Sequence, residues 1–592
     1  MSNDMCLTDK VDLRIAIKVP LRDGVHLNAT IYTPKAQLTP TSAVLLLTPY
    51  GNDTYHERGM YFAASGVPFV IVDSRGRGDS EGTFRPFIQE ARDGYDVTEW
   101  LASQPFCDGQ VGMWGGSYNG YAQWATAKEF PPHLVTIVPV AAPHMGTDSP
   151  MRCNIFYPYS MQWLTLTAGR VHQPQVSGDG GLWSALYLRW HKSGRPFQEL
   201  SAILGTPSDT FREWLMHPHP DSYWDAHNPT AAQYARINIP ILTITGSYDD
   251  DQPGALMHYA EHMRNASASA RSQHYLIIGP WDHLGTRSPK REFGGLKFGP
   301  ASLVDLPKLH LDWYTWTLKQ GPKPAFLRKR VAYYVMGADL WRYADTLEDI
   351  TSHRQSFFLD SAGGANDVFS AGSLRPKVGA GEPDMYSYDP RDTGGPEVDA
   401  EALVDGGSLI YQNVLLALRD RVLVYHSAPF AEDTEISGFF KFTAWISIDC
   451  PDTDFYISVH EIGLDGGSIQ LSTDGLRARY REGLRSPKLI DTRAPLRYEF
   501  STFTFVSRLM RRGHRIRLVI SPVGRLIQAM FTERNFNGGG VVANESIDDA
   551  KQVTVHLFHD SEHPSMLSVP IGHRISADEL APREFAYLST SN

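Results

Sequence analysis

The feature that most constrains this fold is a series of short, continuous apolar runs that recurs from residue 43 onward. The runs read AVLLLT, VPFVIV, LVTIVPV, PILTITG and YLIIG, and glycine, proline or polar residues follow each of them. An unbroken apolar run of this length suits a strand that is buried on both faces. The pattern therefore predicts a mainly parallel sheet flanked by helices. Before it, residues 11–34 alternate apolar and polar around Arg22-Asp23-Gly24, which predicts an antiparallel hairpin.

The amino-acid pattern changes twice along the rest of the chain. The segment between the LVTIVPV and PILTITG runs is rich in aromatic residues, and an insertion after a strand is where such folds place a cap. From about residue 350, short alternating segments punctuated by glycine, aspartate and proline predict a separate jelly roll or β-sandwich. We therefore expect an α/β-hydrolase core over 1–148 and 236–350, a helical cap over 149–235 and a jelly roll over 351–592.

Composition excludes several classes of protein. A net charge of -11 and a pI near 6.0 argue against a nucleic-acid-binding surface, which usually carries a basic excess. The four cysteines are widely spaced and show no zinc-ligand spacing. The first twenty residues contain neither a signal-peptide pattern nor a membrane span, so we expect a cytoplasmic protein with no membrane partner. These properties do not decide between a monomer and a homo-oligomer.

Residues 111–120, VGMWGGSYNG, place a serine among glycines between an apolar run and a helix-compatible stretch. This is the nucleophile-elbow arrangement, in which a sharp strand-to-helix turn lifts the hydroxyl above the sheet. The strict form has glycine two residues after the serine, whereas here Asn119 stands there and Gly120 follows. The pattern nevertheless predicts that Ser117 is a nucleophile.

A serine hydroxyl needs a base, and the base needs an orienting carboxylate. The PILTITG run leads into Asp249, and the next run leads into His283, so the order Ser, Asp, His of α/β-hydrolases is met. Taken singly, the aspartates are also explained as a helix N-cap and the histidine as a surface residue. Three correctly ordered groups at three strand ends favour a catalytic triad.

One competing motif is His258-Tyr259-Ala260-Glu261-His262, which fits the H-x-x-E-H pattern of inverted zinc peptidases. No third ligand is evident at a plausible position, and the segment falls where a helix should pack after the Asp249 strand. We therefore expect neither a metal nor an organic cofactor.

With these residues assembled, the chain resembles the CocE/NonD, or bacterial cocaine esterase-like, serine hydrolases. Their relatives are the X-prolyl dipeptidyl aminopeptidases and the α-amino acid ester hydrolases. The matching stretches are Pro49-Tyr50, VDSRGRGDSEG at 72–82, GGSYNG around Ser117, GSYDDD at 246–251, GPWDH at 279–283 and VMGADLWR at 335–342.

The resemblance implies that Ser117 is the nucleophile, His283 the base and Asp249 its partner. It also implies an oxyanion hole made by the Tyr50 hydroxyl and the Tyr118 N–H group. A glycine three residues after the serine is this family's own form of the elbow, which accounts for Asn119.

We expect cleavage of carboxylic esters, with amides as a second class. The aromatic cap favours a bulky apolar or aromatic acyl group, with Trp163 and Trp183 as candidate contacts. Asp250 and Asp251 match the loop where α-amino acid ester hydrolases bind an ammonium group, although Gln252 replaces a further acid. The alternatives are an α-amino acid ester hydrolase or X-prolyl dipeptidyl peptidase-like enzyme, an acyltransferase, and a carbohydrate-binding protein with a degenerate core.

Overall fold

The computed structural model describes residues 9–206, 208–392, 409–410, 412, 421–522, 532–576, 579 and 587–588. A ten-stranded sheet runs through its first part in the order β1-β2-β4-β3-β5-β6-β9-β10-β13-β14. Neighbouring strands from β4 to β13 are parallel, whereas β1, β2 and β14 are antiparallel edges. The predicted hairpin and parallel sheet are thus confirmed. The strands are β1 (Val11–Pro20), β2 (His26–Pro34), β3 (Thr41–Thr48), β4 (Phe69–Asp73), β5 (Cys107–Gly116), β6 (Leu134–Val140), β9 (Ile241–Tyr248), β10 (His274–Asp282), β13 (Val331–Val335) and β14 (Leu340–Ala344).

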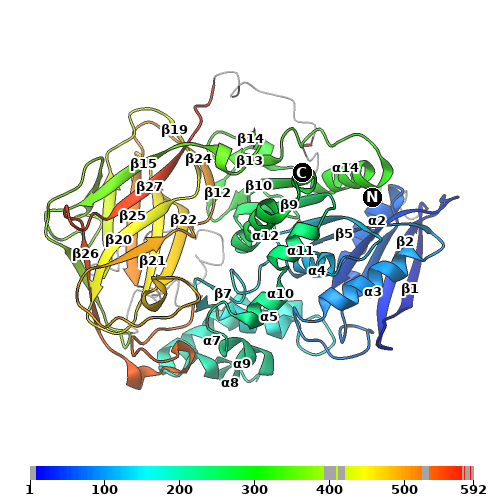
Figure 1. Ribbon diagram of the computed structural model, residues 1–592, viewed down its shortest axis with the longest axis horizontal. Coiled ribbons are helices and arrows are strands. Elements are labelled where there is room, and N and C mark those ends of the chain that lie inside the picture. Colours follow the sequence, from blue (N-terminus) through cyan, green and yellow to red (C-terminus); the bar gives the residue numbers. More distant parts are fainter. Residues whose placement is uncertain are drawn as a thin grey trace.

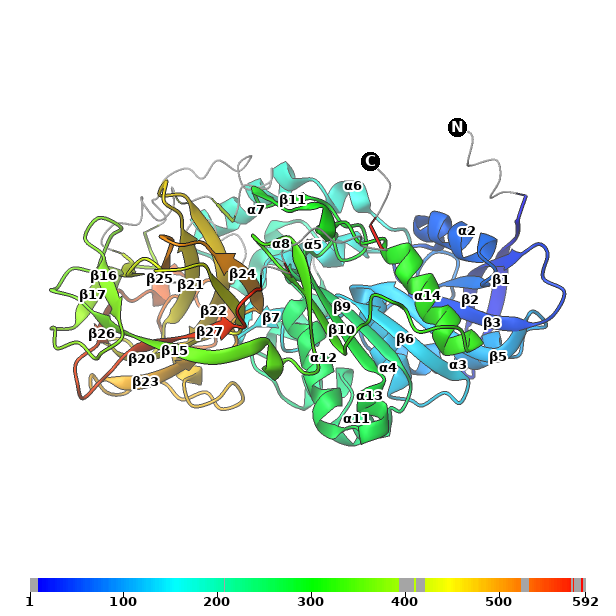
Figure 2. The same cartoon turned by 90° about the horizontal axis from the view of Figure 1, so that it is seen from above.

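Strand β3 shows why the apolar runs are unbroken. Val44 and Leu46 belong to the hydrophobic core on one face of the sheet, while Leu45 and Leu47 belong to the core on the other. Both faces are therefore covered, as a continuous apolar run requires. Figure 2 shows α2 on one side of the sheet and α11, α12 and α13 on the other. The helices of this part are α2 (His56–Ala64), α3 (Glu90–Ala102), α4 (Tyr118–Ala127), α12 (Gln252–Asn265), α13 (Ala268–Ser272) and α14 (Leu306–Lys319).

The inserted segment between β6 and β9 is helical, as predicted, and lies along one side of the core (Figure 1). Its aromatic residues, including Trp190 and Trp214, form a hydrophobic core together with Phe87 and Tyr121 of the α/β part. Most of the aromatic residues therefore hold the cap together. The elements are α5 (Tyr159–Leu166), α6 (Pro174–Ser177), α7 (Gly180–Ser193), α8 (Leu200–Ile203), α9 (Asp209–Leu215), α10 (Ser222–His227), α11 (Ala231–Arg236) and the short strands β7 (Met151–Arg152) and β8 (Ile155–Phe156).

The remaining part is a jelly roll at the opposite end of the molecule from β1 and β2 (Figure 1). The alternating segments of the sequence form its strands, and thirteen strands of the described ranges belong to one hydrogen-bonded system. A small hairpin, β11 (Glu292–Phe293) and β12 (Leu296–Lys297), precedes it. The strands are β15 (Thr351–Asp360), β16 (Gly372–Arg375), β17 (Asp384–Tyr388), β18 (Leu423–Ser427), β19 (Thr434–Gly438), β20 (Lys441–Ile448), β21 (Asp454–Ile462), β22 (Ser468–Arg477), β23 (Leu496–Phe500), β24 (Val506–Met510), β25 (Arg515–Pro522), β26 (Val553–Phe558) and β27 (Met566–Gly572).

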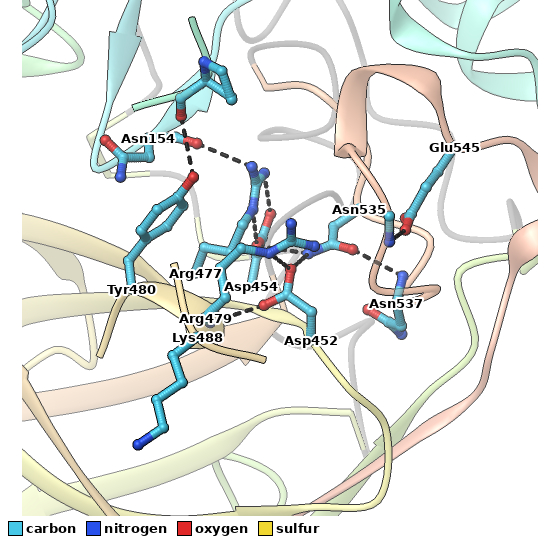
Figure 3. Close-up of polar contacts among 12 residues, drawn as sticks. Asn154, Asp452, Asp454, Arg477, Arg479, Tyr480, Lys488, Asn535, Asn537 and Glu545 are labelled. Carbon is cyan, nitrogen blue, oxygen red and sulfur yellow. Dashed lines mark hydrogen bonds and ion pairs between the residues drawn. The ribbon is translucent and has the colours of Figure 1, made fainter. Parts of the chain in front are cut away.

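A buried ionic network joins the jelly roll to the start of the cap (Figure 3). Arg477 donates to both carboxylate oxygens of Asp454, at 2.8 and 3.0 Å, and to Glu533 at 2.9 Å. It also donates to the main-chain oxygen of Asn154, in the turn between β7 and β8, at 3.0 Å. One side chain therefore fixes three segments that are far apart in the sequence. We call this group, with Arg479 and its partner Asp452, the junction network.

In the part of the chain that the structure describes, no helix combines the length and the apolarity that crossing a membrane would require.

Candidate active site

Ser117 occupies a strained turn between the end of β5 and the start of α4. Its backbone angles, φ 61° and ψ -128°, are unusual for a residue other than glycine and cost of order 1–3 kcal/mol. The turn persists because hydrogen bonds fix it: the Ser117 N–H donates to the Val140 carbonyl at 2.9 Å, and the Ser117 carbonyl accepts from the Tyr121 N–H at 3.0 Å. The hydroxyl is thereby held at the carboxyl end of a central strand.

Glycine is required at two positions of the elbow because neighbouring atoms approach the backbone closely there. A Cβ atom on Gly120 would lie 2.9 Å from the Ala142 Cβ, and one on Gly115 would lie 2.5 Å from the Asn119 Cβ. The backbone therefore approaches the neighbouring strand at the third residue after the serine, not at the second. Asn119 is accommodated because its amide turns to the Tyr55 hydroxyl at 2.7 Å.

His283 and Asp249 lie in direct contact after the ends of β10 and β9. The distance from the His283 Nδ1 to the Asp249 Oδ1 is 2.8 Å, and the Asp249 side chain is fully buried. The other carboxylate oxygen accepts from the Thr245 hydroxyl at 2.8 Å, and the Asp251 N–H donates to Oδ1 at 3.1 Å. A carboxylate held in this way orients the imidazole and favours the proton on Nδ1, which leaves Nε2 as the basic nitrogen.

The loops that carry Ser117 and His283 approach each other. No hydrogen bond joins the Ser117 hydroxyl to the imidazole in the part of the chain that the structure describes, where both residues lie. The turn after His283 nevertheless folds over the elbow, because a Cβ on Gly116 would lie only 2.4 Å from the Arg287 Nη1. Catalytic hydrogen bonds in ligand-free enzymes are often long and tighten when substrate binds.

The two candidate oxyanion donors, Tyr50 and Tyr118, are neighbours whose ring centroids lie 6.3 Å apart. The Tyr50 hydroxyl accepts a hydrogen bond from the Trp163 indole at 3.0 Å, so its own hydrogen remains free to donate. Burial raises the pKa of Tyr50 well above its usual range, which keeps this phenol protonated. Tyr118 is the first residue of α4, where backbone N–H groups have no partner within the helix.

Behind the oxyanion donors lies a carboxyl group that the sequence analysis missed. The Tyr118 hydroxyl donates to Glu90 and accepts from the Phe87 N–H at 3.1 Å. Burial raises the pKa of Glu90 to about 7, and its second oxygen is buried without a hydrogen-bond partner among the described residues. Glu90 lies on the same face of α3 as Val97 and Leu101, and this helical spacing is the signal that marks its burial.

The predicted acidic loop contributes two more carboxylates beside the imidazole. The Asp251 Oδ2 lies 3.7 Å from the His283 Nδ1, and Asp250 is exposed next to it. Desolvation and neighbouring carboxylates raise the pKa of both groups. Asp148, which the sequence analysis did not identify, joins this group: it accepts from the Gly254 N–H at 2.5 Å, and burial raises its pKa to about 7.

Gln252 does not face a ligand. Its amide donates to the Gly246 carbonyl at 2.9 Å and to the Phe505 carbonyl at 3.1 Å, and its oxygen accepts from the Phe505 N–H at 2.6 Å. These bonds tie the start of α12 to the jelly roll.

The two tryptophans proposed as substrate contacts occupy different places. Trp163 is half-buried and stacks on Tyr118 at 5.6 Å and 15°. Trp183 is buried inside the cap, where it contacts Tyr187 and donates to the Val176 carbonyl at 2.9 Å. The structure therefore gives Trp183 a role in cap stability, and its contact with substrate stays a prediction.

The H-x-x-E-H histidines are engaged in buried hydrogen bonds. The His258 ring contacts the Tyr234 hydroxyl at 2.7 Å and the Pro143 carbonyl at 3.1 Å. The His262 ring contacts the Ile237 carbonyl at 3.1 Å and the ring of His274 at 3.0 Å. Both nitrogens of each ring have protein partners, so this pair serves to fix α12 against its neighbours.

Comparison with known families matches both halves of the chain. Residues 23–285 match the X-Pro dipeptidyl-peptidase (S15 family), and residues 326–568 match the X-Pro dipeptidyl-peptidase C-terminal non-catalytic domain. The cocaine esterase of Rhodococcus sp. (strain MB1 Bresler) is 28% identical, over 94% of this chain and 98% of its own length.

Solved structures share the complete fold. An aminopeptidase from the marine sediment archaeon Thaumarchaeota archaeon superposes with a TM-score of 0.80 at 22% identity, over 95% of this chain and 97% of the other. An α-amino acid ester hydrolase gives a TM-score of 0.80 at 20% identity over the same shares. The chain therefore belongs to the CocE/NonD, or cocaine esterase-like, serine hydrolases, as its motifs predicted.

Proposed function

We propose that this protein hydrolyses carboxylic esters through an acyl-enzyme intermediate on Ser117. The observation that carries the proposal is the 2.8 Å contact between His283 and the buried Asp249, beside a serine held in a strained elbow. In the first step His283 takes the hydroxyl proton as Ser117 attacks the ester carbonyl, and then gives it to the departing alcohol. In the second step His283 activates water, which attacks the acyl-enzyme and releases the acid.

The negative charge of the tetrahedral intermediate would be stabilised by the Tyr50 hydroxyl and the Tyr118 N–H. This assignment is supported by the Trp163 bond, which occupies the Tyr50 oxygen as an acceptor and leaves its hydrogen to donate. Donors that are fixed before the reaction need no reorganisation when the charge develops.

A bulky apolar or aromatic acyl group fits the site best. Its support is the aromatic surface beside the triad, formed by Tyr50, Trp163 and Tyr159. The Tyr159 side chain is 53% exposed, which is unusual for a large aromatic residue among buried neighbours. The Asp250 and Asp251 carboxylates act electrostatically on the Tyr159 phenol, so this phenol lies near the acidic loop.

A second candidate is hydrolysis of α-amino acid esters or amides. It is favoured by the three carboxylates Asp148, Asp250 and Asp251 near His283, since an acidic cluster attracts an ammonium group. The relative named α-amino acid ester hydrolase has the same fold. Comparing kcat/KM for phenylalanine 4-nitrophenyl ester with that for its N-acetyl form separates the two candidates.

The test of the proposed function is Ser117→Ala. We expect kcat for 4-nitrophenyl esters to fall by roughly 10⁴ to 10⁶ without a lower unfolding temperature. A fluorophosphonate probe should label the wild type and the control Ser103→Ala, whose serine is exposed on a distant loop, but not Ser117→Ala. Near-normal hydrolysis by Ser117→Ala would refute the assignment.

A further inference from the structure

An arginine lies beside the nucleophile, and the mechanism above does not use it. Arg287 is held by the same turn as the base, because the Arg287 N–H donates to the Leu284 carbonyl at 3.1 Å and the Thr286 N–H donates to the Asp282 carbonyl at 3.1 Å. The Thr286 hydroxyl also donates to the His283 carbonyl at 2.7 Å. The position of this arginine is therefore fixed together with that of the imidazole.

The Arg287 side chain reaches back to the residue before the nucleophile. A Cβ on Gly116 would lie 2.4 Å from the Arg287 Nη1 and 2.6 Å from its Cδ. Any residue other than glycine at position 116 would displace the guanidinium. Gly116 therefore provides the space that lets a cation lie one residue from Ser117.

This guanidinium has no partner in the described ranges. Its Nη1 is buried without a hydrogen bond, and no ion pair or side-chain hydrogen bond involves Nε or Nη2. Two buried arginines of the chain differ in having strong partners: Arg77 donates to the carbonyls of Pro49 at 2.8 Å and Thr167 at 2.6 Å, and Arg477 pairs with Asp454. A partly buried cation whose donors have no hydrogen-bonded partner is unfavourable, and such groups concentrate where a ligand binds.

The charge of Arg287 acts on the reaction site. Burial raises the pKa of Tyr50, Tyr159 and Asp251, and the Arg287 cation opposes the rise in all three. These groups belong to the oxyanion loop, the cap and the acidic loop. The cation therefore lies within electrostatic reach of all three segments.

We infer that Arg287 binds a carboxylate of the substrate and makes the enzyme selective for esters that carry one. A guanidinium presents parallel N–H donors that match the two oxygens of a carboxylate. Asp250 and Asp251 would repel such a group on the imidazole side, so the anion is directed to the elbow side. The inference rests on the proposed ester hydrolysis and adds a substrate class to it.

Matched rigid esters test this selectivity. On the acyl side, 4-nitrophenyl 4-carboxybenzoate is compared with its neutral twin, 4-nitrophenyl 4-carbamoylbenzoate. On the alcohol side, 3-carboxyphenyl benzoate is compared with 3-carbamoylphenyl benzoate. The readout is the ratio of kcat/KM between the charged and the neutral ester of each pair, and the pair that responds identifies which part of the substrate carries the carboxylate.

We expect Arg287→Gln to lower this ratio by roughly 10- to 100-fold in one of the two pairs, with Arg287→Lys between it and the wild type. Lys290→Gln removes a charge of the same sign from an exposed position of the same segment and should leave both ratios unchanged. Equal ratios in the wild type and Arg287→Gln for both pairs would overturn the inference. An arginine that only stabilised the oxyanion would give this result, because it would affect both esters of a pair equally.

A binding measurement keeps this test independent of hydrolysis. We expect 4-carbamoylbenzoate to raise the unfolding temperature of the wild type and of Ser117→Ala, but not that of Arg287→Gln. Stabilisation that is equal in all three proteins would contradict carboxylate binding at Arg287. Failure of the proposed function has a different signature, since Ser117→Ala would then hydrolyse esters as fast as the wild type.

Discussion

The junction network and the active site are both dense groups of charged side chains, but the charges in them are paired differently. In the junction network, Arg477 and Arg479 each have a carboxylate oxygen within 2.8 Å (Figure 3). In the active site, Asp250 and Asp251 are crowded by further carboxylates, and Arg287 has no partner among the described residues.

This difference separates stability from function. Opposite charges that are fully paired fix the relative positions of distant segments, and removing one partner leaves the other uncompensated. Like charges held together, and a cation left unpaired, weaken the folded state but are available to a ligand. The two regions should therefore respond in opposite ways to the same substitution.

The largest effect is expected from Arg477→Gln. This substitution leaves Asp454 and Glu533 buried with a neutral amide, and breaking a buried pair in this way costs about 3–5 kcal/mol. We expect a clearly lower unfolding temperature by circular dichroism. The unfolding temperature of Arg477→Lys should lie between those of Arg477→Gln and the wild type, because a single ammonium replaces the planar guanidinium.

Arg287→Gln is the matched variant for this comparison, since it makes the same chemical change in the active site. It removes a guanidinium that has no partner within the described part of the chain, so the unfolding temperature should not fall. Equal losses of stability in the two variants would break the distinction between the regions.

Glu90 provides a smaller, pH-dependent test. Its pKa is raised by burial from the usual 4.5 to about 7, so the folded state binds this proton more tightly than the unfolded state. The stability contributed by the neutral carboxyl is therefore complete below pH 4.5 and is lost as the pH rises to about 7. Glu90→Gln cannot ionise, so its stability relative to the wild type should rise by up to roughly 3 kcal/mol between about pH 5 and about pH 8.

The control for Glu90 is Glu57→Gln, which changes an exposed glutamate of α2. Its unfolding temperature relative to the wild type should not depend on pH. The free energy of unfolding of Glu90→Gln relative to the wild type could instead stay constant over this pH range. That result would show that Glu90 is ionised throughout.

The sequence predicted the elements that depend on local pattern. Strand β3 could be read from its unbroken apolar residues because both faces of one strand are buried. Asp249 and His283 could be proposed because parallel strands end at one edge of a sheet. The role of Arg287 could not be proposed from the sequence. It depends on the close approach of Gly116, which is distant in the sequence, and on the lack of a hydrogen-bond partner among the described residues. Asp148 was missed for a related reason, since its link to Gly254 joins two separate loops.

The smallest expected effect concerns Trp163, which contacts both oxyanion donors. Trp163→Phe keeps an aromatic ring against Tyr118 but removes the N–H donated to the Tyr50 hydroxyl. Loss of one neutral hydrogen bond of about 0.5–1.5 kcal/mol predicts a roughly 2- to 12-fold lower kcat. KM should change little, because the Tyr50 hydroxyl would act mainly in the transition state.

A double-mutant cycle distinguishes this role from contact with the substrate. If Trp163 acts through Tyr50, the Trp163→Phe change should have no further effect on kcat once Tyr50→Phe has removed the hydroxyl. An equal loss of kcat in both backgrounds would mean that Trp163 contacts the acyl group directly. In that case the Trp163 indole would belong to substrate recognition, and the orientation of the Tyr50 hydrogen would have to come from the substrate itself.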